Sequence, residues 1–177
     1  MPNEFSKEKY LTDSQVKELE RVLNKFKDRD IRNCTMLWVL LYTGGRAQEV
    51  LNLTVKDFCP IEETITIHGL KKSNNREIPI PKWLAKRVSE LQPSEDGRLF
   101  PIAYTRLRDI WVLYRPVPKK LHSLRHTAAI RILRKTKDMA IVKAVLGHRS
   151  WSNTFIYADY LHTQDELRKA LLGGTSW

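Results

Sequence analysis

Residues 64–80, TITIHGLKKSNNREIPI, set the fold class, because apolar and polar residues alternate at both ends of this stretch. Alternation over 64–67 and again over 76–80 is typical of β-strands. Residues 71–75 between the two runs are polar and rich in turn-forming side chains, so the strands are predicted to form an antiparallel β-hairpin. Pro79 places the second strand at an edge of its sheet or near its end, because proline donates no backbone hydrogen bond.

The residues that precede the hairpin repeat at helical spacing. Thr12 is predicted to cap a first helix, with Gln15 as its capping-box partner. A more apolar helix is predicted over 31–42, ending at the glycine pair 44–45. A short helix over 46–51 then leads towards the hairpin.

After the hairpin, helices are predicted over about 83–91, 107–114, from about 121, 138–146, 152–160 and 164–172. The chain is therefore predicted to be mainly α-helical with one small antiparallel β-sheet, an α+β architecture. We expect one domain over 11–172, preceded by an N-terminal segment or linker, 1–10, and followed by a C-terminal tail, 173–177.

The composition indicates a polyanionic partner. The chain has 31 Lys and Arg against 20 Asp and Glu, a formal net charge of +11. Such an excess favours nucleic-acid binding, but charge alone fits DNA, RNA or an acidic membrane surface. No stretch approaches the roughly 18 apolar residues of a membrane span, and the charges within 1–10 exclude a signal peptide. The protein is therefore expected in the cytoplasm, with no membrane partner.

Several short segments carry side chains suited to binding an anion. Arg46 follows two glycines at the start of a helix, where backbone N–H groups and a guanidinium converge. His122 and Arg125 are three residues apart on one helical face. His148 follows a predicted helix C-terminus, and Tyr157 lies on a later amphipathic helix. Each of these features alone is more often a solvated or half-buried side chain.

The order of these groups resembles that of the tyrosine recombinases, also called phage integrases. An arginine, a hairpin lysine, His-x-x-Arg, Gly-His and then a tyrosine nine residues after that histidine follow one another as they do in this family. The matching stretches are 42–53, 121–127, 146–150 and 154–158, within a similarity that covers about 11–172. The resemblance implies the fold of a recombinase catalytic domain.

The resemblance also implies a role for each group. Tyr157 would attack a DNA phosphate and leave a 3′-phosphotyrosine and a free 5′-hydroxyl. Arg46 and Arg125 would bind the non-bridging phosphate oxygens as planar bidentate donors, and His148 would add a hydrogen bond. His122 would assist proton transfer at the tyrosine.

Two of these assignments required a choice between neighbouring residues. Lys71 lies eight residues before Pro79, the usual family spacing for the lysine that protonates the 5′ leaving oxygen. Lys72 would point to the other face of a regular strand. The spacing after the Gly-His pair selects Tyr157 as the nucleophile, whereas Tyr160 lies about one helical turn further on.

Three positions near these groups carry further expectations. Glu49, one turn beyond Arg46, would either orient the arginines from behind or be an ordinary surface glutamate. Gly45 stands where family members usually carry a larger residue, which would loosen the turn before Arg46. Residues 135–137 replace a loop that more commonly contains glycine. The two departures leave the expected chemical groups in place.

The resemblance implies a reaction without a metal or a nucleotide cofactor, because two arginines and a lysine supply the positive charge. The sequence has no acidic cluster suited to Mg²⁺, no glycine-rich phosphate loop and no metal-ligand spacing at its two cysteines. Contacts to the DNA backbone are expected from a set of basic residues, namely Lys72, Arg76, Lys119, Lys120 and Arg149.

Double-stranded DNA carrying a target site is the expected partner. Relatives generally place a second DNA-binding domain ahead of this one, so the chain is expected to be either a fragment or a small stand-alone recombinase. Family members often dock the C-terminal tail on a neighbouring protomer. Residues 165–177 are therefore expected to link subunits in a dimer or tetramer on DNA, or else to pack on their own chain.

Two other functions remain compatible with the same residues. A nicking-closing enzyme like the type IB topoisomerases shares the tyrosine chemistry but relaxes DNA without exchanging partners. A non-catalytic basic DNA-binding domain would make the five segments coincidental or decayed.

Overall fold

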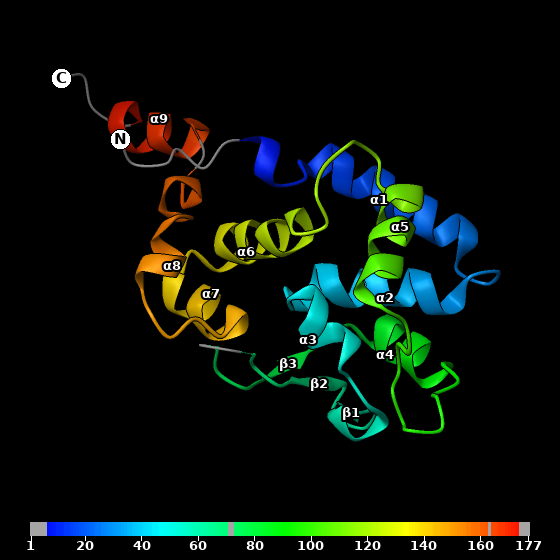
Figure 1. Cartoon of the computed structure of the whole chain (residues 1–177). Helices are drawn as coiled ribbons and strands as arrows, with labels where there is room; N and C mark the ends of the chain where they lie inside the picture. The colour runs from blue at the N-terminus through cyan, green and yellow to red at the C-terminus, as the bar shows by residue number, and fades with distance from the viewer. Residues whose placement is uncertain (1–6, 71–72, 163, 174–177) are drawn as a thin grey trace.

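The computed structural model of the chain describes residues 7–70, 73–162 and 164–173. Helix α1, Asp13–Phe26, begins at the predicted capping box, in which the side chains of Thr12 and Gln15 bond each other's backbone. Helix α2, Ile31–Thr43, crosses the centre of the domain and is buried along most of its length (Figure 1). It ends at Gly44, whose φ of 63° lies in the left-handed region that favours glycine.

A three-stranded antiparallel sheet follows α3 (Ala47–Leu51) and a 3₁₀ turn (Val55–Asp57), with strands β1 (Phe58–Cys59), β2 (Thr64–Ile67) and β3 (Arg76–Pro79). The strand order is β1-β2-β3, so β3 lies at an edge as Pro79 predicted. Ile65 pairs with Ile78 in the register of β2 and β3, and both side chains are buried. The sequence did not predict β1, because two residues are too few to show alternation.

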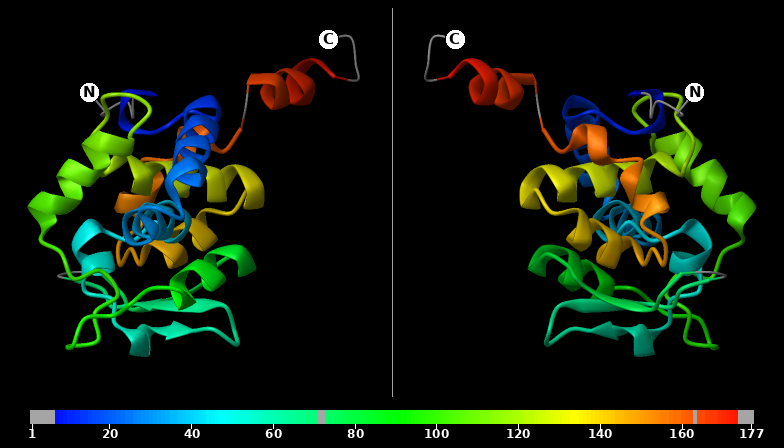
Figure 2. Two further views of the ribbon diagram at one scale, coloured as in Figure 1. Left: turned by 90° about the vertical axis from the view of Figure 1, so that its right-hand side faces the viewer. Right: turned by 90° about the vertical axis from the view of Figure 1, so that its left-hand side faces the viewer.

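The helices after the sheet are α4 (Lys82–Ser89), α5 (Tyr104–Tyr114), α6 (Ser123–Thr136) and α7 (Met139–Leu146). Helix α2 packs against both α4 and α6, and α6 packs in turn against α7. Helix α7 begins at Asp138, whose side chain caps two backbone N–H groups, and ends at Gly147 with a left-handed φ of 67°. Figure 2 shows the sheet along one side of the domain, with the helices stacked on it. The mainly helical α+β architecture is therefore confirmed.

The chain changes course at Tyr157, where the sequence predicted one helix over 152–160. Instead, α8 (Ser152–Phe155) ends before the tyrosine and a 3₁₀ turn (Ala158–Tyr160) begins after it. Tyr157 itself is buried in an apolar cluster formed by α6 and α7, so tertiary packing overrides the local helical pattern. The last helix, α9 (Gln164–Leu172), lies at the far side of the domain from the sheet (Figure 2).

The N-terminal segment is packed onto the domain from Tyr10 onwards. A 3₁₀ turn at Lys7–Lys9 precedes Tyr10, which is buried in the same apolar cluster as Tyr157. The backbone N–H of Leu11 donates to Thr127 Oγ1 on α6 at 2.8 Å. Among the described residues, no helix has the length and apolar character that crossing a membrane would require.

Candidate active site

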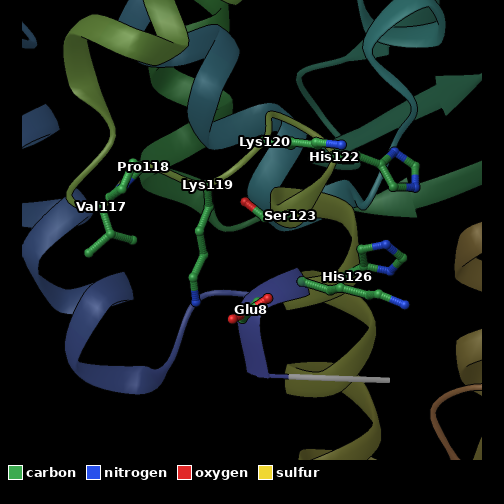
Figure 3. Close-up of a pocket in the computed structure, with 9 residues that line it drawn as sticks. Glu8, Val117, Pro118, Lys119, Lys120, His122, Ser123 and His126 are labelled. Atoms are coloured by element: carbon green, nitrogen blue, oxygen red, sulfur yellow. The ribbon is translucent and has the colours of Figure 1, made fainter. Parts of the chain in front are cut away.

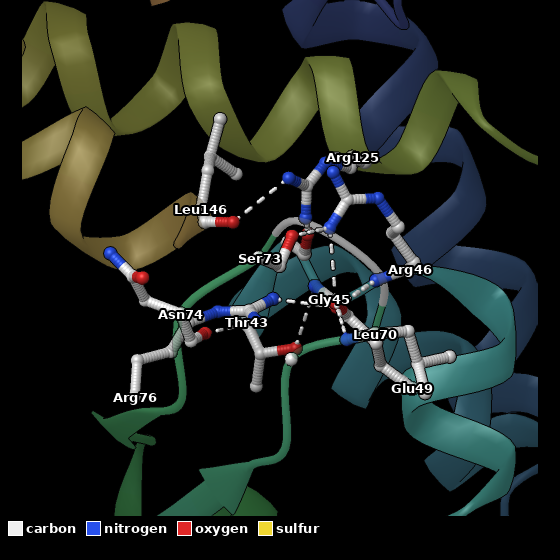
Figure 4. A network of polar contacts seen from close by, with 12 residues as sticks. Thr43, Gly45, Arg46, Glu49, Leu70, Ser73, Asn74, Arg76, Arg125 and Leu146 are labelled. Carbon is white, nitrogen blue, oxygen red and sulfur yellow. Dashed lines mark hydrogen bonds and ion pairs between the residues drawn. The ribbon is translucent and has the colours of Figure 1, made fainter. Parts of the chain in front are cut away.

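Arg46 is held at the junction between α2 and α3. Its backbone N–H donates to Glu49 Oε2 at 2.8 Å, and its guanidinium Nη1 donates to Glu49 Oε1 at 3.0 Å and to the hydroxyl of Ser73 (Figure 4). The first bond caps the N-terminus of α3 and the second fixes the guanidinium over it. Arg46 therefore has both its main chain and its side chain positioned by one carboxylate.

Gly45 packs closely at this junction instead of loosening it. A Cβ atom at this position would lie 2.8 Å from Val50 Cγ2 and 3.2 Å from Ile67 Cδ1. Contacts this short require a neighbouring atom to move, so the expectation of a looser turn before Arg46 was wrong. The side chains of α3 and β2 occupy the space that a larger residue would fill.

Glu49 lies beneath the site with only 1% of its surface exposed, so it is not a surface glutamate. Arg76 Nη2 donates to Glu49 Oε2 at 2.7 Å, and the backbone N–H of Leu70 approaches Oε1 at 3.4 Å. Burial alone would raise the pKa of Glu49, but the hydrogen bonds from Arg76 and from the Arg46 backbone lower it to about 2. The carboxylate is therefore charged at neutral pH.

Arg125 projects from the first turn of α6 and is buried. Its Nη1 donates to the Gly44 carbonyl at 2.6 Å, and its Nη2 donates to the Leu146 carbonyl at 2.9 Å. Burial and then the nearby charges of Arg46 and Arg76 lower the pKa of Arg125 to about 10. The two arginines that the sequence singled out are thus close enough to repel each other, which favours an anion between them.

His148 completes this cluster from the end of α7. Its Nε2 lies 3.1 Å from Arg125 Nη2, and its Nδ1 lies 3.0 Å from Thr154 Oγ1. Burial and the charge of Arg125 lower the pKa of His148 to about 4, so the ring is neutral at neutral pH. Because a guanidinium can only donate, Nε2 accepts from Arg125 and the ring proton resides on Nδ1.

Tyr157 faces the cluster from the break between α8 and the following 3₁₀ turn, with 1% of its surface exposed. Its hydroxyl lies 2.8 Å from His126 Nδ1. Burial raises the pKa of Tyr157 to about 12, against the charges of Arg125 and Arg46, which lower it. Tyr160 instead contacts the ring of Tyr10 edge-on, with ring centroids 5.1 Å apart.

His126 was not singled out from the sequence. It lies one turn after His122 on α6, and the two rings meet edge-on with centroids 4.7 Å apart. Partial desolvation and the charges of Arg125 and Arg46 lower the pKa of His122. Both histidines line a cavity of about 630 Å³ beside the N-terminal segment (Figure 3). Their four-residue spacing was the available signal, since it places two imidazoles on one helical face.

Lys71, the expected catalytic lysine, lies outside the described residues. The residues expected to contact the DNA backbone divide into three groups, of which the first, Lys72, also lies outside the described residues. Arg76 is a correction: its side chain is 5% exposed, and besides Glu49 it donates to the backbone carbonyl of Val145, so it braces the domain internally.

Lys119 is a second correction. Its ammonium donates to the Tyr10 carbonyl and, at 3.1 Å, to Gln15 Oε1, so it ties the N-terminal segment to the loop before α6. Lys120 and Arg149 are exposed, as a backbone contact would require. Arg149 donates to Asn74 Oδ1 at 3.2 Å, next to the hairpin.

The site thus combines two arginines, a neutral histidine and a phenol from separate parts of the chain. Within the part of the chain that the structure describes, no group of three or more His, Cys, Asp or Glu side chains could hold a metal ion. The charges that converge here are those of the guanidinium groups, which suits a bound oxyanion.

Comparison with known proteins agrees with this geometry. Residues 9–164 match the phage integrase family. Tyrosine recombinase XerA of Pyrococcus furiosus is 30% identical over 189 residues, which cover 94% of this chain and 65% of that protein. XerA of Thermococcus kodakarensis is also 30% identical, over 92% of this chain and 61% of its own length. The chain therefore spans about two thirds of the curated recombinases that it matches.

Two solved structures share the fold. The catalytic domain of bacteriophage HP1 integrase superposes with a TM-score of 0.66 at 24% identity, covering 94% of this chain and 98% of that one. XerH recombinase in a post-cleavage complex with a palindromic difH substrate superposes with a TM-score of 0.72 at 23% identity, covering 92% and 52%. From its family match over most of its length, the chain belongs to the phage integrase family, the tyrosine recombinases.

Proposed function

We propose that residues 11–172 form the catalytic domain of a site-specific DNA recombinase, which cleaves and rejoins DNA strands through a phosphotyrosine at Tyr157. The observation that carries this proposal is the placement of the buried phenol. The charges of Arg125 and Arg46 lower its pKa, so both guanidinium groups act on the tyrosine. The phenol oxygen is bonded to His126, which is on the same helix as Arg125, so the tyrosine and one of the two guanidinium groups are carried by connected parts of the site.

The proposed cleavage is an exchange of one phosphate ester for another. Tyr157 Oη forms a bond to phosphorus, the bond from phosphorus to the 5′ oxygen breaks, and the phosphate remains attached to the 3′ side. The phenol proton passes to His122, the group expected to assist proton transfer at the tyrosine, and a proton from Lys71 reaches the 5′ oxygen. Rejoining reverses these steps, so the energy of the broken bond is kept in the phosphotyrosine.

Arg46 and Arg125 would stabilise the transition state, and His148 would add a hydrogen bond to the phosphate in the tautomer that carries its ring proton on Nε2, with Thr154 Oγ1 donating to Nδ1. Each non-bridging oxygen gains charge as the tyrosine attacks, and preorganised donors at that point lower the barrier. Without DNA, Arg125 donates to backbone carbonyls and to His148. A charged phosphate oxygen is a stronger acceptor than these neutral groups and would replace them. Glu49 keeps Arg46 in place but stays neutralised by Arg76 below it.

DNA would be held by the excess of basic residues, including Lys120 and Arg149. We infer that a second DNA-binding domain completes the recombinase, because the chain spans 65% and 61% of two of its relatives. We also propose that the protein self-associates into a dimer or tetramer on DNA. The reaction would take place in the cytoplasm, without a metal ion or a cofactor.

The test is covalent trapping on a pool of nicked duplexes whose central positions are randomised, in buffer containing a chelator. We expect a denaturant-resistant protein–DNA adduct that disappears in Tyr157→Phe and persists in Tyr160→Phe. Absence of an adduct despite DNA binding would indicate a non-catalytic DNA-binding domain. Relaxation of supercoiled plasmid without exchange between two sites would indicate a nicking-closing enzyme.

A further inference from the structure

The hydroxyl of Tyr157 is bonded to His126, a residue outside the set that the family resemblance assigns to catalysis. Nδ1 of His126 lies 2.8 Å from the phenol oxygen, and the two rings are tilted by 58° with centroids 5.9 Å apart. The bond joins α6 to a part of the chain 31 residues away. It therefore links the helix that carries Arg125 directly to the tyrosine.

The backbone around Tyr157 does not by itself fix the phenol. Tyr157 lies between the end of α8 and the start of a 3₁₀ turn, outside both elements. Apolar side chains of α6 and α7, such as Leu133 and Leu146, surround the ring but offer no polar contact to the hydroxyl. The polar end of the ring is thus located by a hydrogen bond.

The surroundings of His126 keep its ring neutral. His122 and Arg125 face it from its own helix, His148 from the end of α7, and Lys9 from the N-terminal segment. Burial first, and then these basic groups, lower the pKa of His126 to about 3. A neutral imidazole has one donor and one acceptor nitrogen, so Nδ1 can accept the phenol proton while Nε2 carries the ring proton.

We propose that His126 is a positioning residue for Tyr157, holding the phenol oxygen towards the arginine cluster by accepting its hydroxyl proton in a hydrogen bond. The proposal rests on the proposed role of Tyr157 as nucleophile. With the proton directed at Nδ1, the lone pairs of the oxygen are left for the phosphorus atom. His122, one turn earlier, reaches the tyrosine through the ring of His126.

The first test compares His126→Phe with His126→Asn in the full chain. Phenylalanine keeps the ring volume and removes the acceptor, so adduct formation in a single turnover should slow about 100-fold with DNA affinity unchanged. Asparagine places an amide where Nδ1 was, and its oxygen should restore most of the rate. A parental rate in His126→Phe, or an equal loss in both variants, would overturn the proposal.

His162→Phe is the matched control, because His162 is an exposed histidine whose ring lies beside Glu166. It should cleave at the parental rate. Thermal unfolding of each variant identifies any change that acts through folding alone.

The second test does not depend on cleavage. The ¹⁵N resonance of His126 Nδ1 should report an acceptor nitrogen in the parental protein and shift in Tyr157→Phe, which removes the hydroxyl. An unchanged resonance would overturn the proposal even if adducts form. If the parental protein forms no adduct but the resonance shifts, the proposed function fails while the hydrogen bond stands.

Discussion

Arg76 and Glu49 form a buried ion pair beneath the site, with 2.7 Å between Nη2 and Oε2. Removing one partner of such a pair leaves the other charge buried without compensation. Glu49→Ala should therefore lower the free energy of unfolding by about 3–5 kcal/mol, measured by urea denaturation. Arg149→Ala, which removes an exposed arginine nearby, should change it by less than about 0.5 kcal/mol. Equal stability of the two variants would contradict the role given to the pair.

The pH dependence of stability should reveal His148. Its folded pKa, about 4, lies below the value of about 6.5 expected in the unfolded chain. The unfolded state therefore binds the proton first, so stability is complete above pH 6.5 and is lost as the pH falls towards 4. The loss at pH 5 should be about 2 kcal/mol from this residue, as an upper bound. His148→Asn should flatten the curve of unfolding free energy against pH over this range; an unchanged slope would argue against a buried neutral ring.

Gly45 should tolerate a side chain only if Val50 is shortened. The Cβ of Gly45→Ala would overlap Val50 Cγ2, so this substitution should cost about 1–3 kcal/mol of stability. In a Val50→Ala background the same substitution should cost clearly less, because the overlapping methyl is gone. Denaturation of the two single variants and the double variant measures this coupling, and strict additivity would show that the overlap is relieved elsewhere.

Lys137 adopts a backbone conformation that favours glycine. Its φ of 56° caps α6 in the left-handed region, where a side chain costs about 1–2 kcal/mol. Lys137→Gly should therefore leave stability unchanged or raise it by up to about 1 kcal/mol, despite losing the contact to Glu166. Lys135→Gly, two residues earlier within α6, should lower stability by about 1 kcal/mol. Thermal unfolding of the two variants measures the difference. An equal loss of stability in Lys137→Gly and Lys135→Gly would contradict the prediction.

The salt dependence of DNA binding should separate basic residues that contact DNA from other exposed basic residues. Lys120→Ala and Arg149→Ala should each reduce the slope of log Kobs against log salt by about 0.9 if each contacts one phosphate. Arg98→Ala, which removes an exposed arginine paired with Asp96, should leave the slope unchanged. The slopes are measured by fluorescence anisotropy on one duplex. Equal slopes in all three variants and the parental protein would exclude phosphate contacts by Lys120 and Arg149.

Local signals predicted most of the fold. The capping box at Thr12 and the glycine at position 44 each act within one helical turn, so the start of α1 and the end of α2 were predicted to within one residue. The range predicted for α7, 138–146, differs from the observed helix by one residue at its start. The break at Tyr157 and the two-residue strand β1 depend on packing against distant elements, which no local pattern reports. These were the features that the sequence missed.

The site could be predicted in part. The family order indicated Arg46, Arg125, His148 and Tyr157, and the fold brings their side chains into one cluster. The hydrogen-bond partners of these residues could not be predicted from the sequence. Glu49 bonds a residue 27 positions away, and exposure of Arg76 was wrongly expected because a single charge on a strand gives no sign of a buried partner. The spacing of His126 from His122 indicated only a shared helical face, and its contact with Tyr157 depends on the fold.

Arg125 also joins the C-terminal ends of two helices through hydrogen bonds. Its guanidinium donates to the carbonyl of Gly44, the C-cap of α2, and to that of Leu146, the last residue of α7. The carbonyl groups at helix ends carry negative partial charge, so the arginine serves as a shared cap for both. If Arg125 binds the scissile phosphate as proposed, a substitution there would change both the contact between these two helix ends and strand cleavage. Selection for folding and selection for cleavage would then act on the same atoms.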